Sequence, residues 1–591
     1  MTMLTGVRNR TPFESAPSHR GRLRLIRRRT ATPYLPSDRI TADHTRRARW
    51  RIPVIVMTSS AVLAGCSGQS SPTAAGADPV AGGHLTVGIG TAIDCFDPQI
   101  SPSSLTSSIL RGVYDSLVYA NPDGSFSPWL ATSWEISPDA TTYTFRLRTG
   151  VTFHDGTAFD AAAVKANFDR IVDPATASQY AGQLISPYRG AEVIDPHTVA
   201  VHLAAPYSPF LRAVASPNLG FHSPKSLTEN AADLCQGGPT QVGTGPFTFT
   251  SATDGEGFTF TRNDTYNWAP ASSDRTGPAY LTSVDYRILP ESSVRLGALT
   301  SGEVDAIDQV AATDIDALAS TEGIEVHRAD PTGIPYTYFF NTDRAPFNDP
   351  RARLAIQKGV DLNTLTQGIF QGKYAPAAAP LNPATFAYDG TLEGTWGYDP
   401  DGAKTLLDEL GYTATDADGY RTKDGKRFTI ALIYDPTYQK PERITYDTAV
   451  QDALRTLGVE LTITPIGNGS YIGVRNSGAY DIIAFGWSGS DPDVLRTIYG
   501  SDQQLADGGA NGSHVRDPEL DTLLQQGLTI TDPEQRATIY SAAQKRILTS
   551  GYGLPAYVAP VVTAASTRVQ GLTYAPDATV PALDSAWTPV D

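Results

Sequence analysis

Apolar residues recur along this chain with two different spacings. Some short segments alternate or cluster β-branched and aromatic residues, as strands do. They are 85–89, 143–147, 198–203 and 459–463. Elsewhere apolar residues recur every three or four positions, as on one face of a helix, for example at Val164, Phe168 and Ile171 after the capping residue Asp160. The alternation of the two kinds of segment predicts an α/β fold.

Further helices have clear starts in the sequence. Asp399-Pro400 and Asp532-Pro533 each combine an N-cap residue with proline, which is well tolerated at the first helical position. Both are followed by an apolar stripe at helical spacing, and Gly411 is expected to end the first of these helices. Another helix is predicted over 440–457.

The first 66 residues differ from the rest in charge and in pattern. Residues 1–51 hold 13 Arg, no Lys and three acidic residues, a net charge of +10, so the rest carries −26 if the whole chain carries −16. The stretch 52–64 is apolar apart from Thr58, Ser59 and Ser60. It is too short for a membrane span of about 20 residues but typical of a signal-peptide core. The stretch ends at Leu63-Ala64-Gly65-Cys66, which resembles the bacterial lipobox.

We therefore expect a lipoprotein signal peptide over 46–66 and diacylation of Cys66. The protein would be anchored to the extracytoplasmic face of the cell membrane. Residues 1–45 form a basic leader that is either disordered or not translated, if the true start lies downstream. Residues 67–81, rich in Ser, Ala, Gly and Pro, predict a flexible tether.

Length and composition exclude several classes of protein. A chain of 591 residues exceeds what one hydrophobic core supports, so two or more domains are expected. No basic cluster follows position 66, so no nucleic-acid partner is expected. Gly469-Ser470-Tyr471-Ile472-Gly473 lacks the G-x-S-x-G spacing of a nucleophile elbow, and no H-E-x-x-H is present, so the chain is not expected to be an enzyme.

Cysteine usage fits an exported protein. Only Cys95 and Cys235 remain after Cys66. In an oxidising compartment two such cysteines often pair, and the alternative is two buried free thiols. No cluster of His, Cys or Met offers metal ligation, so neither a metal site nor a cofactor is expected.

Motifs of one protein family are spread over nearly all of residues 82–591. The longest is the segment 128–156, which reads PWLATSWEISPDATTYTFRLRTGVTFHDG. Shorter ones occur in the family's order at 82–87, 97–98, 243–247, 262–264, 296–305, 340–341, 351–356, 403–407 and 486–487. In these motifs the chain resembles the peptide/nickel class of solute-binding proteins of ABC importers, the oligopeptide- and dipeptide-binding group.

This resemblance implies a two-lobed periplasmic-binding-protein fold whose discontinuous lobes are joined by crossover strands and close on a ligand. The first lobe would comprise 82–118, 215–335 and 550–591, with an extra subdomain over 119–214. The second lobe would comprise 336–549. The chain would cross between the lobes near 336–341 and return near 554–557.

The resemblance also implies that an extended peptide is held by backbone hydrogen bonds from one segment of each lobe. The implied ligand-binding residues are Pro102, Ser103, Ser104, Asn341, Gly486, Trp487, Ser488, Ser490, Asp491 and Tyr557. Core packing is the alternative role for Trp487 and Tyr557.

The sequence departs from the family pattern near Trp487. Ser490 stands where well-studied peptide binders carry an aspartate that pairs with the α-ammonium group of the peptide, and Ala484 replaces an arginine of some members. Either Asp491 substitutes as the ammonium partner, or it is the cap before Pro492 and no such anchor exists.

The implied partners are short peptides, the transmembrane subunits of an ABC permease, and the cytoplasmic ATPase subunits that power import. The alternative is the same fold with a non-peptide cargo, such as chelated nickel, haem or another small solute, because fold does not fix cargo.

Overall fold

The computed structural model describes residues 78–590 except 274, 437, 438, 468 and 577. The predicted leader, the signal peptide with Cys66 and the first part of the predicted tether lie outside these residues. No helix among the described residues has the length and apolar character needed to cross a membrane.

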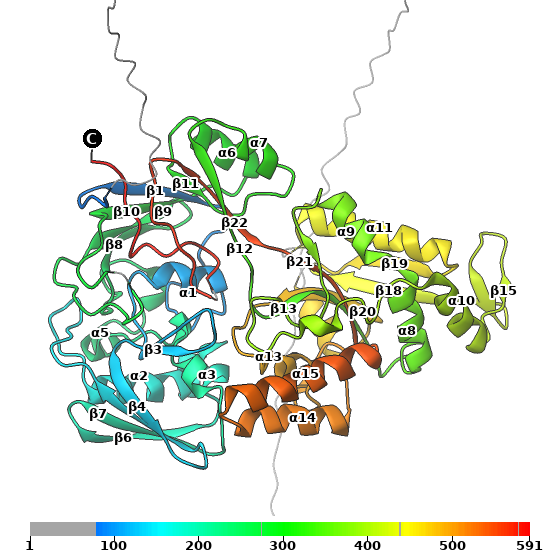
Figure 1. Ribbon diagram of the computed structural model, residues 1–591, viewed down its shortest axis with the longest axis horizontal. Coiled ribbons are helices and arrows are strands. Elements are labelled where there is room, and N and C mark those ends of the chain that lie inside the picture. The colour runs from blue at the N-terminus through cyan, green and yellow to red at the C-terminus, as the bar shows by residue number, and fades with distance from the viewer. Residues whose placement is uncertain (1–77, 274, 437–438, 468, 577, 591) are drawn as a thin grey trace, which may run out of the picture. The chain divides into compact units, whose positions relative to one another are not determined.

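A mixed sheet forms the centre of the first lobe (Figure 1). Its order in space is β12-β22-β11-β1-β10-β9-β8, with β1 parallel to β10 and β22 antiparallel to β12. The strands are β1 (His84–Ile89), β8 (Phe247–Thr253), β9 (Gly257–Arg262), β10 (Ser283–Ile288), β11 (Ala306–Ile307), β12 (Ile324–Ala329) and β22 (Val561–Ser566). The sheet therefore draws on three separate stretches of the chain.

A second mixed sheet forms the centre of the second lobe, in the order β14-β21-β13-β20-β18-β19. Its strands are β13 (Ile334–Phe340), β14 (Ala375–Pro376), β18 (Thr429–Tyr434), β19 (Glu460–Pro465), β20 (Ile482–Trp487) and β21 (Gly553–Val558). A small hairpin sheet, β15 (Ala414–Thr415), β16 (Arg421–Lys423) and β17 (Lys426–Arg427), is separate from it.

The chain passes between the two sheets twice (Figure 1). It leaves the first sheet after Ala329 and enters the second at Ile334, and it returns between Val558 and Val561. The first lobe is therefore discontinuous along the chain, whereas the strands of the second sheet all lie in the single stretch 334–558. The expected two-lobed α/β fold is confirmed. The strand β21 differs from the sequence interpretation. It lies in the segment 550–591, which was assigned to the first lobe, but it pairs with β13 and β14 of the second sheet.

An antiparallel sheet, β4 (Ala131–Ile136), β5 (Thr142–Leu147), β7 (Thr198–Leu203) and β6 (Tyr188–Asp195), lies within the segment predicted to form the extra subdomain. The hairpin β2 (Val118–Ala120) and β3 (Phe126–Pro128) precedes it. Phe145, Phe168 and Phe210 pack in its core, which is separate from the cores of the two main sheets. We use extra subdomain below for this sheet and the segments that share its core.

The predicted helix starts are confirmed. The side chains of Asp160, Asp399 and Asp532 accept backbone hydrogen bonds at the first turns of α2 (Ala161–Val172), α10 (Pro400–Glu409) and α15 (Pro533–Thr549). Gly411 follows α10 with a φ of +91°, a left-handed conformation that favours glycine. The helix predicted over 440–457 is α11 (Pro441–Thr456).

The helices follow the two lobes along the chain. Those of the first lobe and the extra subdomain are α1 (Ser104–Leu110), α2 (Ala161–Val172), α3 (Ala181–Leu184), α4 (Phe210–Ala213), α5 (Pro224–Glu229), α6 (Ser292–Thr300) and α7 (Ile315–Ala319). Those of the second lobe are α8 (Pro350–Gly359), α9 (Leu362–Ile369), α10 (Pro400–Glu409), α11 (Pro441–Thr456), α12 (Tyr471–Asn476), α13 (Val494–Tyr499), α14 (Pro518–Thr529) and α15 (Pro533–Thr549).

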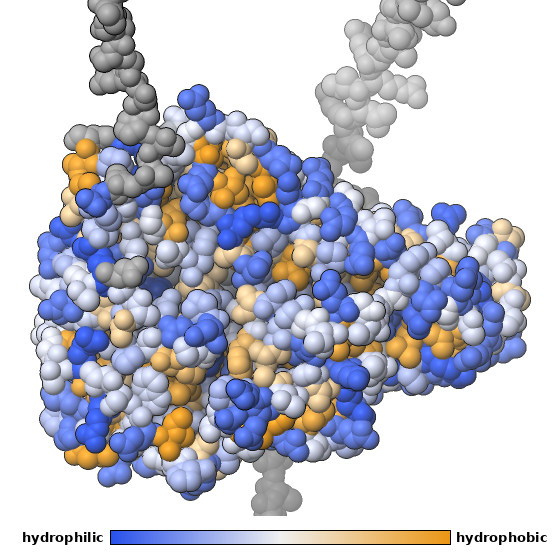
Figure 2. Space-filling model, viewed as in Figure 1, coloured by the Kyte–Doolittle hydropathy of each residue, from blue (hydrophilic) through white to orange (hydrophobic). Residues whose placement is uncertain are grey.

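The surface in Figure 2 is largely hydrophilic, with apolar residues gathered in separate small groups, one of them near α6. Val294 of α6 is 52% exposed. Scattered apolar residues of this kind are normal on protein surfaces and do not mark a ligand site.

Candidate functional site

A cavity of about 410 Å³ is lined by residues of both lobes and of the extra subdomain. Its volume lies within the range of about 300–1,000 Å³ that is usual for small-molecule sites. The lining residues of the first lobe and the extra subdomain are Pro102, Ser104, Ser107, Gln179, Tyr180, Gln183, Leu184, Tyr207, Pro209, Arg212, Ala213, Ser216, Pro217 and Asn218. Those of the second lobe are Gly486, Trp487, Ser488, Gly489, Ser490, Asp491, Asp493, Val494, Arg496 and Thr497. We call this cavity the interlobe pocket.

The second-lobe wall of the pocket is the end of β20 and the loop after it. β20 lies between β13 and β18, but among the described strands β18 pairs with it only at Ile482 and Ile483. From Ala484 to Trp487 the strand therefore has a partner only on the β13 side. Such an edge presents backbone N–H and C=O groups that can pair with an extended ligand.

A close backbone contact fixes the position of Trp487. A Cβ atom at Gly333 would lie 2.0 Å from the Trp487 carbonyl oxygen, and Gly333 has a φ of +94°. Glycine is therefore required there on both grounds. The half-buried Trp487 ring packs against the core of the second lobe at one side, beside Phe485, and lines the pocket at the other.

The two aspartates of the pocket lining are joined in ion pairs with arginines. Arg536 donates two hydrogen bonds to Asp491, at 2.8 and 2.6 Å, and Arg496 donates two to Asp493, at 3.0 and 2.8 Å. Burial raises the pKa of Asp491, but the guanidinium of Arg536 outweighs it and holds the pKa below the usual range. For Asp493 burial dominates, and its pKa is raised despite Arg496.

The charged lining residues, Arg212, Asp491, Asp493 and Arg496, carry a formal charge of zero in sum. The remaining polar lining consists of serine and threonine hydroxyls and of the amides of asparagine and glutamine. Tyr180, Tyr207 and Trp487 add aromatic surface. Among the described residues, no three His, Cys, Asp or Glu side chains come together as metal ligands.

The first-lobe wall includes the loop 97–103 and the start of α1. Asn218, which lines the pocket, donates hydrogen bonds from its amide to the carbonyl oxygens of Pro98 and Ser101, at 3.2 and 3.4 Å. Ser103 accepts a hydrogen bond from the Thr106 backbone at 3.2 Å and so caps α1. These contacts set where Pro102 and Ser104 face the pocket.

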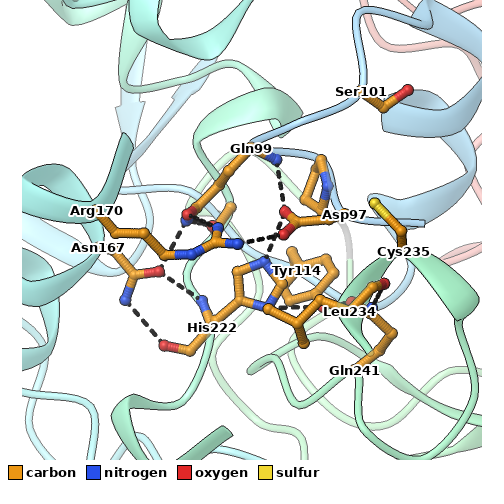
Figure 3. A network of polar contacts seen from close by, with 12 residues as sticks. Asp97, Gln99, Ser101, Tyr114, Asn167, Arg170, His222, Leu234, Cys235 and Gln241 are labelled. Atoms are coloured by element: carbon orange, nitrogen blue, oxygen red, sulfur yellow. Dashed lines mark hydrogen bonds and ion pairs between the residues drawn. The ribbon is translucent and has the colours of Figure 1, made fainter. Parts of the chain in front are cut away.

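A buried polar network holds the same loop against the extra subdomain (Figure 3). Asp97 is fully buried and pairs with Arg170 of α2 at 2.6 Å and with His222 at 3.2 Å. Gln99 accepts a hydrogen bond from Arg170 at 2.6 Å and donates one to Asn167 at 2.8 Å. Burial raises the pKa of Asp97, but the charges and hydrogen bonds of His222 and Arg170 lower it by more. The net pKa of Asp97 is therefore well below its usual range.

A disulfide bond joins Cys95 to Cys235 next to this network. The neighbouring backbone N–H of Phe96 donates to the Cys235 carbonyl at 3.0 Å. Of the two alternatives that the sequence left open, the structure has the bonded pair. Together the disulfide and the buried network attach the loop that carries Pro102 to the rest of the first lobe.

Most of the ligand-binding residues expected from the sequence line the interlobe pocket. They are Pro102, Ser104, Gly486, Trp487, Ser488, Ser490 and Asp491. Ser103 caps α1 beside the pocket. Asn341 and Tyr557 are not among the lining residues. Asn341 is buried and donates to the carbonyl oxygens of Gly478 and Tyr480, and the buried ring of Tyr557 stacks on Tyr336.

The wall formed by 179–184 and 207–218 was missed by sequence reasoning. Tyr207 and Arg212 follow the predicted strand 198–203 in a stretch rich in proline and apolar residues, which gave no sign of a ligand site. Their segments are held at the pocket by contacts with the first lobe: 217–219 packs against α1, and the Gln179 N–H donates to the Ile100 carbonyl.

Comparisons with known proteins agree with this architecture. A profile of the bacterial extracellular solute-binding proteins, family 5 Middle, matches residues 125–506. The glutathione-binding protein GsiB of Escherichia coli K12 is 27% identical over 503 residues, which are 83% of this chain and 92% of GsiB.

Solved structures are similar over most of the chain. NikA from Brucella suis, in complex with Fe(III)-EDTA, has a TM-score of 0.75 and 26% identity, over 86% of this chain and 100% of NikA. DppA from Helicobacter pylori, in complex with the peptide STSA, has a TM-score of 0.71 and 25% identity, over 86% of this chain and 98% of DppA. Because the family profile covers more than half of its length, this chain belongs to the family 5 extracellular solute-binding proteins, the solute-binding components of ABC importers.

Proposed function

We propose that this protein captures short peptides in the interlobe pocket and delivers them to a membrane permease with cytoplasmic ATPase subunits. The observation that carries the proposal is the position of the one-sided end of β20 at the pocket wall. A peptide laid along this edge satisfies its own amides whatever its side chains are. Hydroxyl and amide groups on the facing wall suit the rest of its backbone.

The ion pairs of the pocket favour a peptide whose ends are not held by Asp491. Both carboxylate oxygens of Asp491 accept from Arg536, and one of them also accepts from the Asp493 backbone at 2.8 Å. Few acceptor positions remain for an ammonium group. We therefore propose that backbone pairing and contacts with Trp487 supply most of the affinity.

Relatives support a peptide or a peptide-like cargo. The name of GsiB states that it binds glutathione, itself a tripeptide, and DppA was solved with the peptide STSA. NikA, solved with Fe(III)-EDTA, supports a second candidate, a chelated metal. In either case the protein would act by binding, with no catalytic step.

Identification of the bound molecules separates these two candidates. The chain from residue 67 onward is purified and gently denatured, and the released molecules are analysed by mass spectrometry and for metal content. A heterogeneous set of short peptides is expected. A single non-peptide species, or a stoichiometric metal, would contradict the peptide proposal.

A variant pair places the cargo in the pocket. Trp487→Ala should lower the affinity for recovered peptides at least tenfold, roughly the effect of losing a central aromatic contact. Tyr398→Ala is the matched control, because Tyr398 is a second-lobe aromatic residue that is 55% exposed and does not line the pocket. Equal affinities for the two variants would argue against this site.

We further propose that Cys66 carries the membrane anchor. The lipobox-like Leu63-Ala64-Gly65-Cys66 after a short apolar stretch supports it. Cys66→Ser should move the protein from the membrane fraction to the soluble fraction in the native host. An unchanged distribution would exclude diacylation as the anchor.

A further inference from the structure

A direct contact joins the two lobes at the side of the pocket where α14 ends. The backbone N–H of Ser208, in the extra subdomain, donates to the Leu528 carbonyl at 2.7 Å, and its hydroxyl donates to the Gly527 carbonyl at 2.9 Å. Leu528 also packs against the hydrophobic core of the extra subdomain. We call these interactions the Ser208 contact. It lies one residue from Tyr207, which lines the pocket.

One arginine connects the Ser208 contact with the ligand pocket. Arg536 of α15 donates from Nε to the same Gly527 carbonyl at 2.9 Å, while its two terminal nitrogens hold Asp491. The Gly527 carbonyl therefore accepts hydrogen bonds from both lobes. Arg536 is only 6% exposed, so its three bonds form in a site with little competing water.

The surroundings of Arg536 leave it little freedom to move. Its guanidinium lies 5.2 Å from the centre of the Tyr540 ring. Gly527 lets α14 approach this ring, because a Cβ atom there would lie 2.6 Å from the Tyr540 side chain. A planar guanidinium in such a position fixes Asp491 and the Gly527 carbonyl at the same time, which a lysine could not do.

We propose that Arg536 is a positioning residue that links occupancy of the pocket to the Ser208 contact. A ligand that orders the loop 488–491 fixes Asp491, and Asp491 holds Arg536 so that the Gly527 carbonyl points at Ser208. Ligand binding then favours the form in which both lobes touch. The inference rests on the proposed capture of solutes in this pocket, but not on the cargo being a peptide.

The expected effect falls mainly on the lifetime of the closed form. Interactions that exist only when the lobes are together slow release of the ligand more than they speed its capture. Ser208→Ala removes one neutral hydrogen bond and should reduce the ratio of closed to open molecules about fivefold. Arg536→Lys should reduce this ratio further. Ser208→Thr keeps the hydroxyl, so its ratio of closed to open molecules should be close to that of the wild type.

Distances between spin labels test the link without a known cargo. Double electron–electron resonance is measured on the full chain in a Cys66→Ser background, with labels at Ser186→Cys of the extra subdomain and Gln525→Cys of α14, both exposed positions. The probe is the tetrapeptide Ser-Thr-Ser-Ala, and each variant is measured with and without it. Ser477→Ala is the matched control, because its hydroxyl donates to a carbonyl, that of Val474, within the second lobe.

We expect a larger long-distance population in Ser208→Ala and Arg536→Lys than in the wild type and in Ser477→Ala, with thermal midpoints of Ser208→Ala and Ser477→Ala alike. When Ser208→Ala and Arg536→Lys are combined, the loss of closed molecules should be smaller than the sum of the two single losses, because both changes break one chain of contacts. The proposal would be overturned if the variants gave the same distance distributions as the wild type both with and without the tetrapeptide. It would also be overturned if the wild type showed no short distance in either condition.

The same experiment separates the two proposals. If the peptide does not close the wild type but the variants still lose closed molecules, the tetrapeptide is not a cargo, while Arg536 and Ser208 are shown to hold the lobes together. If the peptide closes every variant equally, the link is wrong and the cargo stands.

Discussion

The buried carboxylate of Asp447 accepts three hydrogen bonds. The donors are Tyr338 at 2.7 Å, Tyr336 at 3.3 Å and Gln439 at 2.9 Å. Burial raises the pKa of Asp447 to about 6, although these donors lower it. Tyr336 and Tyr338 belong to β13, the strand by which the chain enters the second lobe. The protonation of Asp447 therefore bears on the stability of that lobe.

Replacement of Asp447 by Asn should change how stability depends on pH. Because the pKa is raised in the folded protein, Asp447 contributes stability that is fully present below its ordinary value of 3.8 and is lost as the pH rises through about 6. An asparagine does not titrate. Asp447→Asn should therefore gain on the wild type by about 2–3 kcal/mol between pH 4 and pH 7, measured by chemical unfolding.

The difference between the two proteins is the quantity to follow, because His154, whose pKa burial lowers to about 4, acts in the opposite direction in both. A difference that stays constant from pH 4 to pH 7 would contradict the raised pKa of Asp447.

Single residues also show where sequence reasoning stops. The sequence could not decide whether Asp491 binds a ligand or caps a helix, because its partner Arg536 lies 45 positions away. Tyr557 fitted the pattern of a ligand contact, but β21 brings its ring onto Tyr336 in the core. Both outcomes depend on side chains that only the folded chain brings together.

At the scale of elements, the starts of the helices were predictable because the signals are local. Asp and Pro at adjacent positions are enough to place the first turns of α10 and α15. The one-sided end of β20 was not predictable. It arises because the pairing of β18 with β20 stops at Ile483, which is a property of two strands about fifty residues apart.

Loss of an N-cap should weaken α15 locally. Asp532 accepts a hydrogen bond from the Gln535 N–H at 2.9 Å, and its side chain bonds to no other element among the residues that the structure describes. Asp532→Ala should reduce stability by about 1 kcal/mol. Hydrogen exchange of the first-turn amides of α15 should rise accordingly.

Asp517 provides the comparison for this prediction. It caps α14, but it also accepts hydrogen bonds from Arg546 at 2.5 and 2.8 Å and from Tyr552 at 2.9 Å, and it is 4% exposed. Asp517→Ala should cost clearly more, since it also removes the buried ion-pair partner of Arg546 and the acceptor of the Tyr552 hydroxyl. Equal losses for the two variants would show that the caps, and not the ion pair, dominate.

At the scale of the whole molecule, the disulfide closes a long loop. Cys95 and Cys235 are 140 positions apart, and the extra subdomain lies between them. A cross-link of this kind restricts the unfolded chain. Replacement of both cysteines by serine should reduce the free energy of unfolding by about 2–4 kcal/mol.

Chemical unfolding of this double variant is the measurement, with the wild type under oxidising conditions beside it. The loss should be accompanied by faster hydrogen exchange in the loop that carries Pro102. An unchanged unfolding midpoint would mean that the buried Asp97 network holds the loop without the cross-link.

The central claim is that one solute is held by both lobes at once. Hydrogen–deuterium exchange, with and without the cargo recovered from the purified protein, tests it most directly. We expect the amides of 103–107 in the first lobe and those of 486–497, Pro492 apart, in the second to exchange more slowly together when the cargo binds. Protection confined to one lobe, or found only outside the interlobe pocket, would contradict the account.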